Sequence, residues 1–242
     1  MRRPPARPRS GMARKLVVAA AVLGLLLAGA DIGLRAWAEG WVAGRVAESL
    51  ALSREPRLDL HGFPFLVQFA RGRFERVDVE ADGLLAGSLM VQSVRLELEQ
   101  VRFARGQLLT RGGGVIRAER GTGRAVITDG ALSALVQAEG VPVEVEFLGP
   151  RIRVSTTLQI GDQELEASAT GRLRFDDGTV SFTPQRVDAG GSFEVPPTTV
   201  AFEVTLPELL PGVRYERVRV REGDATLDVA VRSAVIRVPP AA

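Results

Sequence analysis

The chain has 242 residues, of which 45% are hydrophobic and 25% charged, so it suits one sizeable globular domain, or at most two small ones, plus a targeting segment. Residues 1–15 hold six of the 31 basic residues and no acid, which leaves 25 basic against 29 acidic residues in the remainder. That balance excludes a nucleic-acid partner, which requires clustered positive charge, and the absence of cysteine excludes disulfides, thiolate metal sites and cysteine nucleophiles.

An export segment is predicted at the N-terminus. Residues 2–15 are basic and proline-rich, and residues 16–30 form an uncharged apolar run that ends in an A-x-A cleavage option. A spanning helix needs about 20 apolar residues, which this run reaches only if residues 32–34 are counted past Asp31. We therefore predict a basic cytoplasmic tail with a signal peptide or a signal anchor over residues 1–34. The body would then lie outside the cytoplasm, at the cell membrane or in a periplasm-like space.

An amphipathic helix is predicted over residues 35–52, where apolar side chains recur at steps of three and four. Trp37 and Trp41 lie one turn apart on its apolar face. Because tryptophan favours the membrane interface, one interpretation places both rings at the bilayer surface. The other interpretation packs the same stripe on the rest of the domain.

Antiparallel β-structure is predicted for most of residues 58–238. Apolar and polar side chains alternate strictly, for example over residues 76–81 and 94–99, which indicates one buried and one wet face. Residues 63–70 break the pattern as a short helix or packed loop. Residues 129–138 are predicted to form a helix with Asp129 as its N-cap.

Glycine-containing turns are predicted between the alternating runs. They are expected at Asp82-Gly83, at Gly121-Thr122-Gly123, at Asp176-Asp177-Gly178 and at Gly223-Asp224.

The fold class that follows is α+β and mainly β. Two short helices cannot cover eight or more amphipathic strands, so we expect a strongly curved antiparallel sheet that wraps the long N-terminal helix. Strong curvature can leave an apolar tunnel or cavity for a hydrophobic ligand. The alternative is a sheet that simply packs shut.

Catalytic chemistry is not indicated. His61 is the only histidine, no G-x-S-x-G motif accompanies a serine, and the paired carboxylates sit in a turn or on a wet strand face. We expect a non-enzymatic protein with no catalytic residue, no metal and no cofactor.

A family resemblance is carried by residues 61–84, HGFPFLVQFARGRFERVDVEADGL. This stretch resembles the G-F-P-F-L…G-x-[FY]-x-x-V-x-V-x-A-x-G-[LV] signature of the actinobacterial LmeA-like family of phospholipid-binding cell-envelope proteins. Weaker similarity around Arg35–Ala47, Gly121–Leu135 and Leu209–Leu227 extends the match over roughly residues 30–237.

The resemblance implies phospholipid binding and a fold similar to the tubular lipid-holding domains of the bactericidal/permeability-increasing class. It also implies a part in envelope lipid or lipoglycan maturation, by lipid shuttling.

Candidate lipid contacts follow from this implied function. We assign an entrance to Phe63, Phe65, Leu66 and Phe69, and an inner lining to Phe74, Val77, Val79, Leu132 and Leu135. The alternative for each of these residues is an ordinary core position. The expected partners are phospholipid and, through the N-terminal segment, a membrane.

Two other functions remain open at this stage. One is a membrane-anchored structural or adaptor domain without a ligand. The other is an enzyme that acts on lipid or glycan, for which the sequence displays no polar catalytic cluster.

Overall fold

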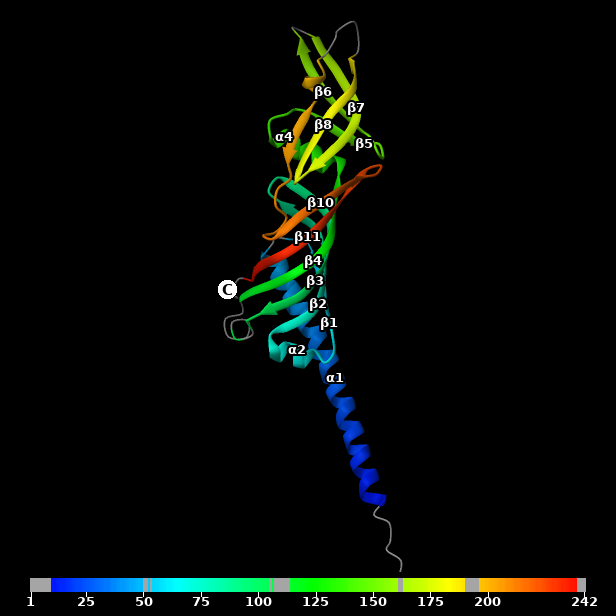
Figure 1. Ribbon diagram of the computed structural model, residues 1–242, viewed down its shortest axis with the longest axis vertical. Helices are drawn as coiled ribbons and strands as arrows, with labels where there is room; N and C mark the ends of the chain where they lie inside the picture. Colours follow the sequence, from blue (N-terminus) through cyan, green and yellow to red (C-terminus); the bar gives the residue numbers. More distant parts are fainter. Residues whose placement is uncertain are drawn as a thin grey trace, which may run out of the picture.

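The computed structural model describes residues 10–49, 52, 54–104, 106, 114–160, 163–189 and 196–238. The molecule is elongated, with a long helix at one end and two antiparallel sheets that follow one another along its length (Figure 1). Both sheets and the helices contribute to one continuous cluster of buried apolar side chains.

The first sheet has six strands in the order β1-β2-β3-β4-β11-β10. Their bounds are β1 Arg57–His61, β2 Arg73–Ala86, β3 Leu89–Phe103, β4 Gly114–Thr128, β10 Val213–Val220 and β11 Asp224–Val238. All neighbouring strands are antiparallel. The predicted alternation is confirmed: Val94, Leu96 and Leu98 of β3 are buried while the residues between them are exposed.

The second sheet has five strands in the order β5-β6-β7-β8-β9. Their bounds are β5 Glu144–Phe147, β6 Ile152–Ile160, β7 Gln163–Asp176, β8 Thr179–Ala189 and β9 Phe202–Thr205, with a short 3-10 turn, η1 Pro197–Thr199, before β9. The helix α4, Asp129–Ala138, connects the sheets and packs on β3, β4, β5 and β9. Its N-cap is Thr128, whose Oγ1 accepts from the Ala131 N–H at 3.2 Å, and not Asp129 as predicted.

The helix α1 runs without a break from Ser10 to Ser49. Its C-terminal half contacts β1, β11 and the short helix α2, Phe65–Arg71, while its N-terminal half extends away from the sheets (Figure 1). The predicted boundary at residues 34 and 35 therefore falls inside one helix, and residues 50 and 51 of the predicted 35–52 helix lie outside the described residues. In the described part of the chain, no helix combines the length and the apolarity needed to cross a membrane.

Two parts of the fold prediction need correction. The mainly β fold with antiparallel strands and an N-terminal helix is confirmed, but the strands form two sheets that are neither closed nor strongly curled. Helix α1 lies along one face of the six-stranded sheet and is not wrapped by it. The physical reason is that α1, α4 and the second sheet together cover the apolar faces of the strands, so one sheet does not need to curl around them.

Two of the predicted turns are also wrong. Asp82-Gly83 lies inside β2 and Gly121-Thr122-Gly123 lies inside β4. A Cβ at Gly121 would meet the Glu97 carbonyl oxygen at 2.4 Å, so close strand approach, and not a turn, requires glycine there. The turns at Asp176–Gly178 and Gly223-Asp224 are confirmed by the ends of the strands around them.

Candidate functional site

An apolar pocket lies between α1 and the inner face of the six-stranded sheet, with a volume of about 400 Å³. Seven elements contribute to its walls, so the pocket exists only once residues far apart in sequence have come together. The lining residues are Trp37, Ala38, Trp41, Val42, Arg45, Val46, Leu58, Leu60, Phe69, Phe74, Val77, Val79, Leu98, Val101, Phe103, Ile116 and Ile236.

The helix wall of the pocket is formed by the apolar stripe of α1. Trp37 and Trp41 stack with ring centroids 6.4 Å apart, and Trp37 is 62% exposed, which places it at the rim. The stripe therefore faces the β-domain, while the Trp37 ring remains open to solvent, and the placement of both rings at a bilayer surface stays a prediction.

Arg45 is the one charged residue among the described lining residues. Its guanidinium carbon lies 5.9 Å from the centroid of the Trp41 ring, and its Nη1 is 3.2 Å from the Glu48 carboxylate, which is 67% exposed. An exposed ion pair of this kind contributes little stability, so the cation is available to a competing anion. An apolar wall with a single cation suits an amphipathic ligand that has an apolar tail and an anionic head.

The α2 end of the pocket is closed by a cluster of four phenylalanines. Phe65 stacks on Phe69 and Phe74 at 5.9 and 5.6 Å, and Phe103 approaches Phe69 and Phe74 at 5.5 and 5.2 Å. Helix α2 supplies Phe65 and Phe69, so its position determines whether this end is shut.

Asp31 fixes α2 against α1. The carboxylate is 5% exposed, and its two oxygens accept hydrogen bonds from the Phe65 and Leu66 N–H groups, each at 2.8 Å. Pro64 occupies the N-cap position and provides no side-chain cap, so the acceptors that the first turn of α2 needs come from another helix. At the other end of α2, Gly72 has φ +67 and closes the helix through bonds to the Gln68 and Phe69 carbonyls.

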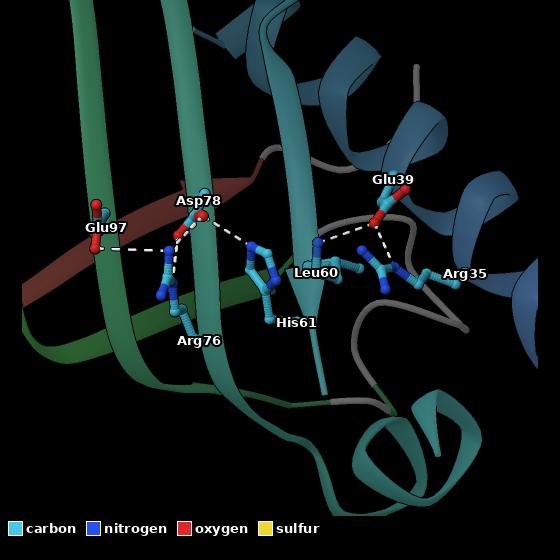
Figure 2. A network of polar contacts seen from close by, with 7 residues as sticks. All are labelled: Arg35, Glu39, Leu60, His61, Arg76, Asp78 and Glu97. Carbon is cyan, nitrogen blue, oxygen red and sulfur yellow. Dashed lines mark hydrogen bonds and ion pairs between the residues drawn. The ribbon is translucent and has the colours of Figure 1, made fainter. Parts of the chain in front are cut away.

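A second carboxylate joins α1 to the edge strand β1. Glu39 Oε1 accepts from the Arg35 Nε at 2.8 Å and from the Leu60 N–H at 2.9 Å (Figure 2). Because β1 is the edge strand of the sheet, the side of it that does not face β2 has no neighbouring strand, and Glu39 gives the Leu60 N–H a hydrogen-bond partner.

The histidine belongs to a separate network on the outer face of the same sheet. His61 Nε2 lies 2.7 Å from Asp78 Oδ2, and both Asp78 oxygens accept from the Arg76 guanidinium at 2.9 Å (Figure 2). The Arg76 guanidinium and, to a smaller extent, His61 hold the pKa of the Asp78 carboxyl below its usual range. Arg76 also lies 3.7 Å from Glu97, so the network ties β1, β2 and β3 together.

Among the residues that the structure describes, no three His, Asp or Glu side chains are grouped to hold a metal ion. The network faces away from the apolar pocket, because Leu60, the neighbour of His61 along β1, lines that pocket.

The structure separates the residues predicted for lipid binding into three groups. Phe69, Phe74, Val77 and Val79 line the pocket. Phe65 is buried behind Phe69 and Phe74, and Leu66 is half-buried beside it.

The remaining predicted contacts lie elsewhere. Phe63 is 75% exposed on the loop before α2. Leu132 and Leu135 are buried in α4, outside the pocket lining.

Sequence reasoning missed two residues of the site. Asp31 looked like an interruption of an apolar run, although an acid in such a run signals a buried hydrogen-bonding partner. Arg45 was missed because helical spacing alone does not show that its guanidinium lies over the Trp41 ring.

Comparison with known protein families gives a match over most of the chain. A family model described as LmeA-like phospholipid-binding matches residues 29–230, which run from within α1 into the first half of β11. No curated protein and no solved structure matches the chain.

Proposed function

This chain belongs to the LmeA-like phospholipid-binding family, and we propose that it binds phospholipid by taking an acyl chain into the pocket between α1 and the six-stranded sheet. The observation that carries the proposal is the pocket itself, in which a single cation lies among otherwise uncharged, mostly apolar lining residues. The family match covers every lining residue of the pocket except Ile236 of β11.

The size and lining of the pocket support one acyl chain. Its volume of about 400 Å³ falls within the range of about 300–1,000 Å³ that is common for small-molecule sites. Each methylene moved from water into such surroundings gains about 0.8 kcal/mol. A chain of ordinary length therefore needs no directional contact along its tail.

The phosphate of the headgroup is proposed to bind Arg45. A guanidinium presents paired N–H donors that match phosphate oxygens. The ion pair that Arg45 forms with the exposed Glu48 is weak, so a phosphate can replace the Glu48 carboxylate. The tail would then enter past Trp37 and Trp41 while the head stays at the rim.

The end of the molecule that carries α2 is proposed to face the membrane. Large apolar side chains are exposed there on α1 and on the loop before α2, namely Ile32, Leu34, Trp37 and Phe63. The same helix continues into the apolar run and the basic residues that indicate export. This arrangement would keep residues 35–238 outside the cytoplasm as one envelope domain that carries phospholipid without chemical change.

The test is native mass spectrometry with lipid extraction on the full-length chain purified from host membranes. A tryptophan at Leu58, which lines the pocket, fills space that the acyl chain would use. A tryptophan at Leu85 of β2 is the matched control, because Leu85 is exposed and lies outside the pocket.

We expect bound phospholipid in the wild type and in Leu85→Trp, and its loss in Leu58→Trp. A lipid-free mass for the wild type, with no uptake from added phospholipid, would contradict the proposal. The chain would then be better described as an anchored structural domain without a ligand.

A further inference from the structure

Four arginines gather around a hollow on the outer face of the six-stranded sheet, on the opposite side from the apolar pocket. The hollow has a volume of about 410 Å³, and its polar lining consists of Ser93, Arg95, Arg124, Arg219, Arg221 and Thr226. Strands β3, β4, β10 and β11 and the turn after β10 supply these residues, and no carboxylate is among the lining residues described. We call these four cations the outer arginine cluster.

The strand register places two of the cations directly opposite one another. Arg95 of β3 pairs with Arg124 of β4 in an antiparallel register, where like charges repel. Elsewhere on the same two strands Glu99 stands opposite Arg120, with their side chains 3.0 Å apart. The same two strands also place Arg102 opposite Arg117, so what distinguishes Arg95 and Arg124 is that their pair borders a hollow with two further arginines.

Neighbouring acids neutralise only part of the cluster. Glu80 lies 3.1 Å from Arg95, and Asp228 accepts from Arg219 at 2.6 Å and lies 3.7 Å from Arg124. Only two carboxylates thus pair with the four arginines of the cluster, and Arg221 has no ion-pair partner within the described residues.

Two hydroxyl groups complete the lining. Ser93 and Thr226 are half-buried and form no side-chain hydrogen bond within the described part of the chain. Hydroxyl donors beside guanidiniums are the groups that commonly bind phosphate oxygens.

We propose that the outer arginine cluster binds a phosphate group. An anion here would relieve the repulsion between Arg95 and Arg124, occupy Arg221 and accept from both hydroxyls. The phosphate could belong to a soluble phosphate ester or to a lipid headgroup, since both present the same oxygens. The site does not depend on the acyl pocket, because the sheet separates the two faces.

The experiment compares three full-length proteins in neutral-detergent micelles: the wild type, Arg124→Gln and Arg120→Gln. Arg120 is the matched control, because it lies on β4, is exposed like Arg124 and is outside the hollow. The thermal midpoint is measured in one arm with inorganic phosphate against chloride at equal ionic strength. In the other arm it is measured with phosphatidylglycerol added to the micelles and no inorganic phosphate.

We expect a saturable rise of the midpoint in the wild type and in Arg120→Gln that is lost in Arg124→Gln. In chloride alone, Arg124→Gln should be at least as stable as the wild type, because it removes the like-charge pair. A response in the first arm indicates a soluble phosphate source, and a response confined to the second arm indicates a headgroup.

Equal shifts in all three proteins would reflect general salt or lipid effects and would overturn the proposal, as would no shift in either arm. Uptake of phosphatidylglycerol by the acyl pocket would raise the midpoint of all three proteins alike, so the outer arginine cluster is judged by the difference between Arg124→Gln and the other two proteins, and the acyl pocket by its own variants.

Discussion

Replacing Asp31 by alanine should release α2 and open the phenylalanine end of the pocket. The substitution removes the acceptor of two backbone N–H groups at 2.8 Å, in a site where the carboxylate is almost fully buried. A hydrogen bond to a charged group contributes about 1.5–3 kcal/mol, and loss of a helix cap costs about 0.5–2 kcal/mol. Because Leu66 is only half-buried and water can replace part of its bond, we expect α2 to lose about 2–3 kcal/mol of local stability.

Amide hydrogen exchange of residues 65–72 measures this loss directly. Since about 1.4 kcal/mol corresponds to a factor of ten, exchange there should accelerate about 30- to 150-fold. Asp31→Asn should fall between the two proteins, because an amide oxygen can serve one N–H while its nitrogen faces the other.

Asp176→Ala is the control, since Asp176 is exposed in a hairpin of the second sheet. If exchange over residues 65–72 were the same in Asp31→Ala and Asp176→Ala, Asp31 would not be what holds α2, and the account of the pocket end would fail.

Three further predictions concern the pocket and the sheet. Arg45→Gln should weaken retention of anionic phospholipid by about tenfold or more, since it removes a charged hydrogen-bond donor. Arg54→Gln, which changes an exposed residue outside the pocket, should leave retention unchanged. Lipid titration by native mass spectrometry measures both variants. Phe74→Ala should lower the free energy of unfolding by about 3–5 kcal/mol, because the Phe74 ring is buried. Phe63→Ala should leave it almost unchanged, because the Phe63 ring is exposed. Denaturant titration measures both values. The depressed pKa of Asp78 stabilises the fold above the ordinary carboxyl value of about 3.9, and this contribution disappears as pH falls through the folded-state value. The thermal midpoint of Asp78→Asn should therefore lie below that of the wild type at pH 6 and converge with it on acidification; a constant gap would refute the linkage.

The mainly β character could be predicted from sequence because alternation has a direct physical meaning. A side chain such as Leu96, flanked by Arg95 and Glu97, identifies the buried face of a strand wherever that strand lies. Alternation does not say what covers that face, so the prediction of one curled sheet was wrong and two sheets with α1 and α4 against them were not foreseen.

The prediction of glycine-containing turns was partly wrong for a related reason. Asp176-Asp177-Gly178 forms a turn, with φ values of 42 and 84 at its last two residues, and local chemistry was enough to find it. Gly123 in β4 is required by neighbours that are distant in sequence, since a Cβ there would approach the Leu96 side chain and the Arg95 carbonyl within 2.5 Å. A single sequence carries no signal that distinguishes the two cases.

The candidate site was predicted in part because its lining comes from alternating strands. Val77 and Val79 of β2 were predicted from their period of two, and Phe69 from its place in a short aromatic segment. Leu132 and Leu135 share the same apolar character, but α4 carries them to another part of the core. Which apolar residues face a common space depends on tertiary packing.

Two carboxylates of α1 explain how a pocket can persist beneath this helix. Asp31 and Glu39 are eight residues apart, so they lie on similar faces about two turns apart, and they bond to backbone N–H groups of α2 and β1. Hydrogen bonds of this kind fix the position of α1 through its polar contacts, so tight apolar packing is not needed to keep it in place. The space between Val42 or Val46 and the sheet can therefore stay open for a ligand, and filling it with an acyl chain would add burial without moving the helix.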